Sequence, residues 1–202
     1  MCIRDRLKKE FMNKANIKLG SKKILLSVGR LIERKGFHWF VDEVIPPLIE
    51  DYKDFIYVIA GAGPMQKYIE DIIHKKNLYN WVILLGKIDD ELLGLLYNIS
   101  DIFIMPNIPV EGDIEGFGVV ALEASSCKLP VIASNLEGIR DALLDGEIGD
   151  LILPLDPLNF SKAILNLLES DNLRKKIGEK ARELVLDNFV SVSYTHLTLP
   201  TN

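Results

Sequence analysis

EGDIEGFGVVALEA, residues 111–124, is the stretch around which the chain is organised. Its two glutamates, Glu115 and Glu123, are separated by seven residues, and a Gly-Phe-Gly sequence lies between them. The glycines of that sequence, Gly116 and Gly118, allow a tight turn and a close approach of the backbone to a ligand. The apolar residues that follow predict the start of a buried helix, whose free N–H groups and dipole favour an anion such as a phosphate.

Glu123 follows one helical turn later, inside an otherwise apolar segment. Burying an unpaired carboxylate costs several kcal/mol or shifts its pKa, so this side chain needs hydrogen-bond donors. The two hydroxyls of a ribose are one source of such donors. The alternative interpretation is a solvated glutamate on an open helix face, which is the commoner case for a single Glu.

The composition is that of an ordinary soluble protein, with 202 residues, 48% of them hydrophobic and 26% charged, and a net charge of -5. No stretch combines clustered Lys and Arg with aromatic residues, which argues against nucleic acid as a partner. No apolar run approaches the roughly 20 residues that a membrane span requires, and no signal peptide precedes the first predicted strand. We therefore expect a cytoplasmic protein. Cys2 and Cys127 are too few for a disulfide framework or a zinc site, and we expect Cys127 in or near the core.

The two ends differ from the rest of the chain. MCIRDR at the start and VSYTHLTLPTN at the end resemble translated sequencing-library adapter. We therefore predict that residues 1–6 and 191–202 are adapter-derived and that residues 7–190 form one domain, for which the length is sufficient.

Short apolar runs alternate with helix patterns along residues 7–190. Strands are predicted at 23–28, 56–60, 82–85, 102–105, 131–133 and 151–153. Helices are predicted at 36–48, 65–76, 89–98, 118–126, 139–144, 158–168 and 172–188. This alternation predicts an α/β fold with a doubly wound parallel sheet of about six strands and helices on both faces.

Such a sheet binds ligands at the carboxyl ends of its strands. The conspicuous glycines and charges follow strands at those ends: Gly29-Arg30, Gly61 to Pro64, Gly86-Lys87 and the loop that contains Glu115.

Four segments, taken in order, resemble a known family: SVGRLIERKG (27–36), IAGAGP (59–64), LLGKIDDELLGLLYNISDIFIMPN (84–107) and EGFGVVALEASSCKLPVIAS (115–134). Together they resemble the carboxyl-terminal half of the retaining family 4 (group 1) glycosyltransferases of the GT-B fold. The resemblance covers nearly all of residues 7–190. It implies that these residues form the Rossmann-like, nucleotide-sugar-binding domain that is one half of a GT-B enzyme.

The resemblance implies roles for residues after the first and third predicted strands. Arg30 and Lys35, beside Gly29, would hold the donor diphosphate and stabilise its charge as it leaves. The alternative for these cations is a pair of solvated surface charges. The residues that would lie along the nucleobase are Gly86, Lys87 and Ile88, although an ordinary strand-to-helix turn is equally compatible with them.

The resemblance also implies that Glu115 faces the donor sugar and that Glu123 accepts hydrogen bonds from the ribose hydroxyls. Phe117, Gly118 and Val119 would offer backbone N–H groups to the sugar or to the leaving phosphate. Glu115, with Arg30 and Lys35, would then make up the catalytic set, Glu115 as a positioning residue and not as a nucleophile.

The implied reaction is the transfer of a hexosyl group from a nucleotide diphosphate sugar to an acceptor hydroxyl, with retention at the anomeric carbon. A compact Asp-x-Asp motif is absent from the sequence, which fits a reaction without a metal ion or other cofactor. Consistent donors are UDP, GDP or ADP sugars, in polysaccharide or glycolipid biosynthesis. The acceptor would bind an amino-terminal domain missing here, and only that half would associate with a membrane, so the isolated fragment would be inactive. Two alternatives remain open, a catalytically silent nucleotide-sugar-binding module and a sugar-nucleotide epimerase of similar fold.

Other residues are assigned structural roles. His38 is expected on a helix face beside Trp39, and His74 on a solvated face among lysines. The glycines of 61–64 are expected to form a turn. Asn107 stands where the family often has a small hydroxyl residue, and we expect residues 108–114 to shape the donor-sugar pocket.

Overall fold

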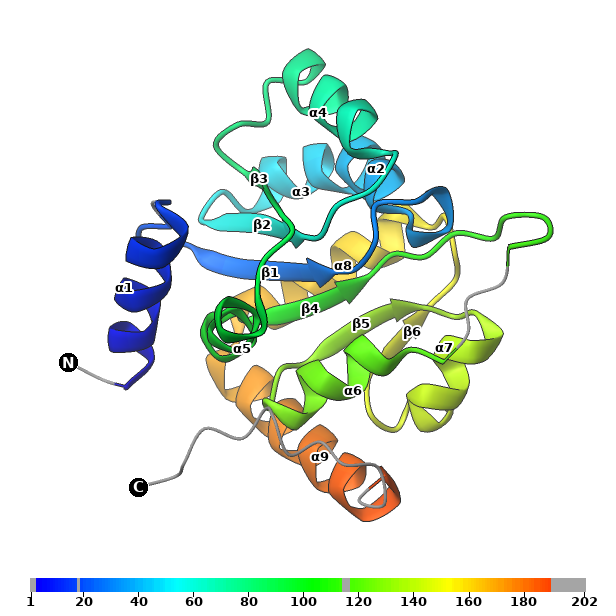
Figure 1. The fold of residues 1–202 in the computed structure, drawn as a ribbon. Helices are drawn as coiled ribbons and strands as arrows, with labels where there is room; N and C mark the ends of the chain where they lie inside the picture. Colours follow the sequence, from blue (N-terminus) through cyan, green and yellow to red (C-terminus); the bar gives the residue numbers. More distant parts are fainter. Residues whose placement is uncertain (1–2, 18, 114–116, 190–202) are drawn as a thin grey trace.

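Six parallel strands form one sheet in the computed structural model, which describes residues 3–17, 19–113 and 117–189 (Figure 1). The order across the sheet is β3-β2-β1-β4-β5-β6. The strands are β1 (Lys23–Val28), β2 (Phe55–Ala60), β3 (Val82–Gly86), β4 (Ile102–Met105), β5 (Val131–Ser134) and β6 (Asp150–Ile152). All neighbouring pairs are parallel, so the predicted fold class is confirmed.

Apart from the first, which is not among the predicted helices, the helices lie close to their predicted ranges. They are α1 (Ile3–Ala15), α2 (Phe37–Trp39), α3 (Ile45–Asp51), α4 (Gln66–Lys75), α5 (Asp90–Ile99), α6 (Val119–Ser126), α7 (Glu137–Ala142), α8 (Pro157–Glu169) and α9 (Asp171–Phe189). The helix predicted at 139–144 begins earlier, and a separate 3-10 turn, Leu144–Gly146, follows it because Leu144 and Asp145 have positive φ angles.

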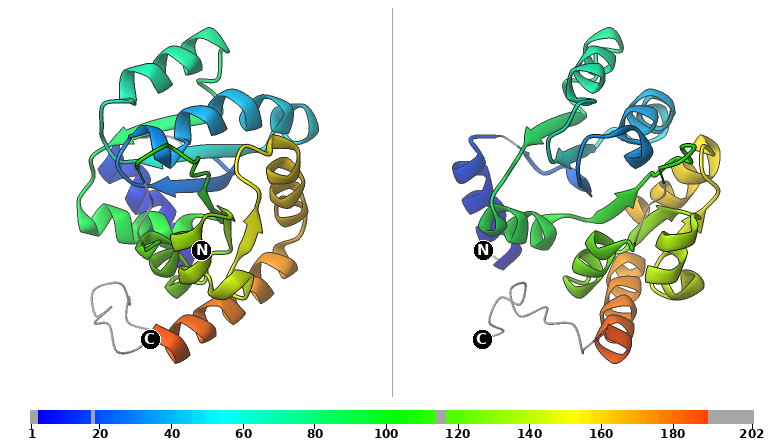
Figure 2. Two further views of the ribbon diagram at one scale, coloured as in Figure 1. Left: turned by 90° about the vertical axis from the view of Figure 1, so that its right-hand side faces the viewer. Right: turned by 45° about the vertical axis from the view of Figure 1, so that its right-hand side comes forward.

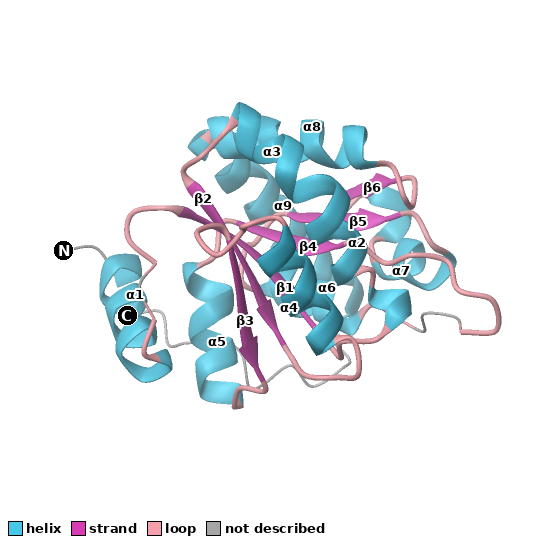
Figure 3. Cartoon of the chain, turned by 90° about the horizontal axis from the view of Figure 1, so that it is seen from above, coloured by secondary structure: helices cyan, strands magenta, loops and turns pink. Residues whose placement is uncertain are grey.

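Helices cover both faces of the sheet, as the views in Figures 2 and 3 show. Residues of α1, α5, α6, α7 and α9 form one core with the sheet, and residues of α2, α3, α4 and α8 form the other. The four inner strands, β2, β1, β4 and β5, lack polar alternation because both of their faces are buried, and β2 is buried along its whole length.

The helix predicted at 36–48 continues through Pro46 and Pro47 to Asp51, with a π-helical turn at Phe40–Val44 between α2 and α3. Proline has no backbone N–H, so the carbonyl groups one turn earlier lose their usual donors. The Lys76 ammonium supplies one replacement, donating to the Asp42 carbonyl oxygen at 2.6 Å.

Helix α1 begins before the predicted domain boundary at Leu7 and passes it without a break. It packs against α5, and Arg4 donates to the Ile99 carbonyl oxygen at 2.6 Å. The boundaries at residues 6 and 190 remain predictions. Among the described residues, every helix is too short or too polar to cross a membrane.

Candidate nucleotide-sugar site

The carboxyl ends of β1 and β4 lie next to each other at the centre of the sheet. The chain leaves β1 toward β2 and β3 on one side, and β4 starts the other side, so the strand order reverses between β1 and β4. Doubly wound sheets bind ligands in the crevice at such a reversal. The loops that follow these two strands contain most of the predicted site residues, and Figure 1 shows them at the arrowhead end of the sheet.

The loop after β1 brings three predicted residues together. Gly29 ends the strand, and Arg30 follows it with an exposed side chain. The Lys35 side chain folds back toward Gly29, because a Cβ atom on Gly29 would lie 3.5 Å from Lys35 Cε. Two positive charges therefore stand in one short loop at the carboxyl edge of the sheet.

Two glycines let neighbouring loops touch this one. A Cβ atom on Gly36 would lie 1.9 Å from the Pro106 carbonyl oxygen, and Gly36 has a φ of 66°. A Cβ atom on Gly61 would lie 1.9 Å from the Gly29 carbonyl oxygen. Any larger residue would force these loops apart, so the glycine at position 61 packs the β2 loop against the β1 loop, in keeping with the turn that the sequence predicts there.

The start of α6 differs from the expectation in two respects. Gly118 has a φ of -72°, which any residue adopts, so its conformation does not require glycine. The Val119 N–H, predicted to face the donor, donates to the Phe117 carbonyl oxygen at 2.8 Å. Phe117 is 46% exposed, and its ring lies 6.0 Å from that of Phe189 at the end of α9.

Glu123 lies on α6 and is half-buried, and it has a protein partner that the sequence-based prediction missed. The hydroxyl of Tyr97, on α5, donates to Glu123 Oε2 at 2.9 Å. Burial raises the pKa of Glu123, and the hydrogen bond from Tyr97 opposes that rise. Burial also raises the pKa of Tyr97 well above its usual value, so this phenol keeps its proton and donates. An open, fully solvated Glu123 is therefore excluded.

The three residues predicted to lie along a nucleobase are the last residue of β3 and the first two of the loop that follows it. Gly86 has a φ of 68°, and its carbonyl oxygen accepts from the Gly61 N–H at 2.8 Å. Lys87 is exposed, and Ile88 is partly buried against the core. The structure thus places these residues at the same edge as the β1 loop. Glu115, with Gly116, lies outside the described residues.

A second missed contact joins the loops after β1 and β4. Arg34 Nη1 donates to Asp113 Oδ1 at 2.8 Å, across 79 positions of the sequence. The sequence gives only one indication of this contact: the two loops contain opposite charges, and they follow strands that are neighbours in the sheet. Asn107, at the start of the β4 loop, is buried, with 1% of its surface exposed.

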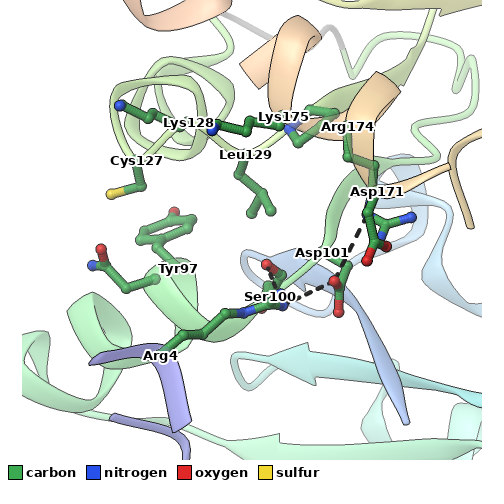
Figure 4. Close-up of a pocket in the computed structure, with 12 residues that line it drawn as sticks. Arg4, Tyr97, Ser100, Asp101, Cys127, Lys128, Leu129, Asp171, Arg174 and Lys175 are labelled. Carbon is green, nitrogen blue, oxygen red and sulfur yellow. Dashed lines mark hydrogen bonds and ion pairs between the residues drawn. The ribbon is translucent and has the colours of Figure 1, made fainter. Parts of the chain in front are cut away.

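A pocket of about 260 Å³ lies at the opposite, amino edge of the sheet (Figure 4). Asp101 and Arg174 line it, with Arg4, Asp171 and Lys175 around them. None of the predicted site residues is among the lining residues, although Tyr97, the hydrogen-bond partner of Glu123, does line this pocket. Among the described residues, no three His, Cys, Asp or Glu side chains are grouped so that they could hold a metal ion.

The fold and the cationic loop at its centre define a Rossmann-like domain of the GT-B type. Residues 8–184 match the family described as Glycosyl transferases group 1, and the chain belongs to that family.

Comparisons with individual proteins agree. The chain is 33% identical over 158 residues to an uncharacterized glycosyltransferase of Methanocaldococcus jannaschii, covering 78% of this chain and 42% of the relative. It is 29% identical over 174 residues to a GDP-mannose-dependent α-(1-6)-phosphatidylinositol monomannoside mannosyltransferase of Mycolicibacterium smegmatis, covering 85% of this chain and 45% of the relative. The chain thus spans less than half the length of both relatives.

A solved structure shows the same fold over almost its whole length. The crystal structure of the C-terminal domain of a glycosyl transferase group 1 family protein from Francisella tularensis superimposes with a TM-score of 0.73. The sequence identity is 24%, and the superposition covers 89% of this chain and 91% of that one.

Proposed function

We propose that this chain is the donor-binding, carboxyl-terminal half of a retaining family 4 glycosyltransferase. The reaction is transfer of a hexosyl group from a nucleotide diphosphate sugar to an acceptor hydroxyl. Two observations together support the proposal. The family match extends over residues 8–184, and the loop with Arg30 and Lys35 lies at the carboxyl edge where β1 and β4 meet.

The diphosphate is the group on which these residues act. Two cations in one loop neutralise a bound diphosphate and the negative charge that grows on it as it leaves, and the amino end of α6 adds its dipole. We propose that this charge makes a metal ion unnecessary. Glu115 would position the donor sugar, and Glu123 would accept a ribose hydroxyl with the oxygen that Tyr97 leaves open.

We propose that the acceptor binds to a second domain. The two curated relatives are more than twice as long as the matched region, and the Francisella fold neighbour is a C-terminal domain. We therefore place acceptor binding, membrane contact and water exclusion in that second domain, and the reaction in the cytoplasm. The chain by itself should bind nucleotide weakly and transfer no sugar.

Calorimetric titration of the chain with UDP, GDP and ADP, in the absence of metal, tests the proposal. GDP is titrated first because the mycobacterial relative is GDP-mannose-dependent. We expect one diphosphate to bind near millimolar Kd, about -4 kcal/mol, and more tightly than its nucleoside. Replacing Arg30 and Lys35 together by Ala should abolish the preference for diphosphate over nucleoside.

The matched control replaces Lys175 and Lys176 by Ala, which removes two positive charges from exposed positions on α9. This control should keep the preference for diphosphate. If none of the three diphosphates binds, or if the Arg30 and Lys35 double variant keeps its preference, the proposed site is wrong.

A further inference from the structure

Arg34 is a third cation in the loop after β1. Its side chain pairs with a carboxylate, that of Asp113. Its Nη1 atom lies 2.8 Å from Asp113 Oδ1, and the two side chains are 24% and 44% exposed. A partly exposed ion pair of this kind contributes little to stability. Its effect is better sought in the geometry of the two loops that it joins.

The backbone joins the same loops. The Ile108 N–H donates to the Arg34 carbonyl oxygen at 2.9 Å, and Gly36 lies directly against the Pro106 carbonyl. Arg34 is therefore held to the β4 loop by its main chain and by its side chain.

Asp113 is itself held by a local turn. Its N–H donates to the Val110 carbonyl oxygen at 3.1 Å, and Gly112 between them has a φ of 74°. The turn formed by residues 110–113 lies within the long loop that extends beyond the carboxyl edge of the sheet (Figure 1). Asp113 thus belongs to a hydrogen-bonded turn.

The backbone that carries Arg34 also carries Lys35. Both residues belong to the 3-10 turn Glu33–Lys35, which the Lys35 N–H stabilises by donating to the Ile32 carbonyl oxygen at 3.1 Å. The Lys35 side chain leaves this turn and folds toward Gly29. Anchoring Arg34 therefore fixes the direction from which Lys35 reaches the end of β1.

We propose that Arg34 and Asp113 are a positioning pair that holds the turn bearing Lys35 in the orientation required to bind the donor diphosphate. Arg34 acts through Lys35 and is not a phosphate ligand. This inference rests on the proposed nucleotide-sugar site and adds two residues to it, one of them on the β4 loop.

The Asp113→Asn variant separates this role from simple electrostatics, because the two predict opposite signs. Removing a carboxylate beside an anion site, and releasing Arg34 to bind the anion, would strengthen diphosphate binding. An asparagine at position 113 would keep only a neutral hydrogen bond from Arg34 in place of the ion pair, so a positioning role predicts a more loosely held turn and weaker diphosphate binding. We expect Asp113→Asn to weaken binding of the preferred diphosphate, among UDP, GDP and ADP, by about five- to tenfold, with binding of the corresponding nucleoside unchanged.

Glu111→Gln is the matched control, because it removes the same charge from an exposed position of the same turn. It should leave diphosphate binding unchanged or slightly tighter. The exchanged pair, Arg34→Asp with Asp113→Arg, should recover most of the affinity that Asp113→Asn loses. Thermal unfolding of all variants should stay close to that of the unaltered chain.

Tighter or unchanged diphosphate binding in Asp113→Asn would overturn the positioning role and leave the proposed function standing. Equal weakening in Glu111→Gln, or no recovery in the exchanged pair, would also overturn it. If the unaltered chain binds none of the three diphosphates, the proposed function fails, and this inference fails with it.

Discussion

At the scale of single residues, the charged residues of the candidate site could be predicted from the sequence, but the partners of some of them could not. Arg30 and Lys35 are recognisable because they stand in one loop after a strand. Tyr97 is not, because its hydroxyl meets Glu123 only when α5 packs beside α6. The structure thus gives Glu123 a protein donor in addition to the predicted ribose hydroxyls, because Tyr97 occupies one of the two carboxylate oxygens.

Nucleotide binding should depend on the ionisation of Glu123. Burial raises its pKa, and the charge of Asp90 adds to that rise. An ionised carboxylate accepts a ribose hydroxyl better than the protonated acid, so affinity should fall as the pH drops through this raised pKa. For folding the sign is opposite. The buried carboxylate disfavours the folded state once it ionises, so this contribution to stability is lost as the pH rises through the raised pKa.

Calorimetry with the preferred diphosphate at several pH values checks this dependence against Glu123→Gln. The variant should bind about 1 to 3 kcal/mol more weakly at neutral pH, the scale of one charge-assisted hydrogen bond. The pH dependence of binding that remains in the variant then reflects the ionisation of the diphosphate. Equal affinity in variant and unaltered chain would remove Glu123 from the ribose site.

At the scale of elements, the least regular helix is the one formed by α2, the π-helical turn and α3. The sequence indicates a helix there and shows the two prolines, but it does not show how their missing N–H groups are compensated. The structure supplies Lys76, which bonds the Asp42 carbonyl and also pairs with the Asp42 carboxylate at 2.5 Å.

Lys76→Met should therefore destabilise the fold by about 1 kcal/mol, since it removes a donor that the helix cannot replace internally. The low figure reflects the solvent exposure of the pair. Urea unfolding measures the effect. Lys75→Met, at an exposed position one residue earlier on α4, is the control and should change stability by less than half as much. Equal changes in both variants would show that Lys76 is an ordinary surface lysine.

At the scale of the whole molecule, the two edges of the sheet differ. The carboxyl edge carries the candidate site, and the amino edge carries a buried charge cluster. Asp101, with its side chain 3% exposed, lies 3.7 Å from Arg174 and 2.9 Å from Arg4. Arg174 is 7% exposed and also donates to the carbonyl oxygens of Leu167 and Leu168. This cluster ties the start of α9 to the sheet.

Removing the two arginines should have very different costs. Arg174→Met leaves a buried carboxylate without its buried partner, which costs about 3–5 kcal/mol. Arg4→Ala removes a side chain that is 45% exposed, so it should cost at most about 1 kcal/mol. Chemical denaturation of both variants, with Arg174→Lys as the charge-retaining comparison, measures this. A cost for Arg4→Ala as large as that of Arg174→Met would make residues 1–6 an integral part of the fold and contradict the predicted boundary at Leu7.

The sequence alone predicted the strands and most of the helices, and it placed the candidate site residues after the carboxyl ends of the strands. KILLSV and FIYVIA show no regular alternation of polar and apolar residues because strands buried on both faces need no polar side, and all six predicted strands are present. The residues after the strands followed from the same pattern, since parallel strands end at one edge. These features depend on neighbours in the chain, which a sequence displays directly.

The strand order and the residue pairs of the candidate site depend on tertiary packing and could not be predicted from the sequence. Tyr97 and Glu123 are 26 positions apart, and Arg34 and Asp113 are 79 positions apart. Each pair forms because two helices, or two loops that follow different strands, pack together. The charge or hydroxyl of one residue does not indicate which residue will be its partner. Packing between segments that are distant in the sequence therefore sets the geometry of the candidate site.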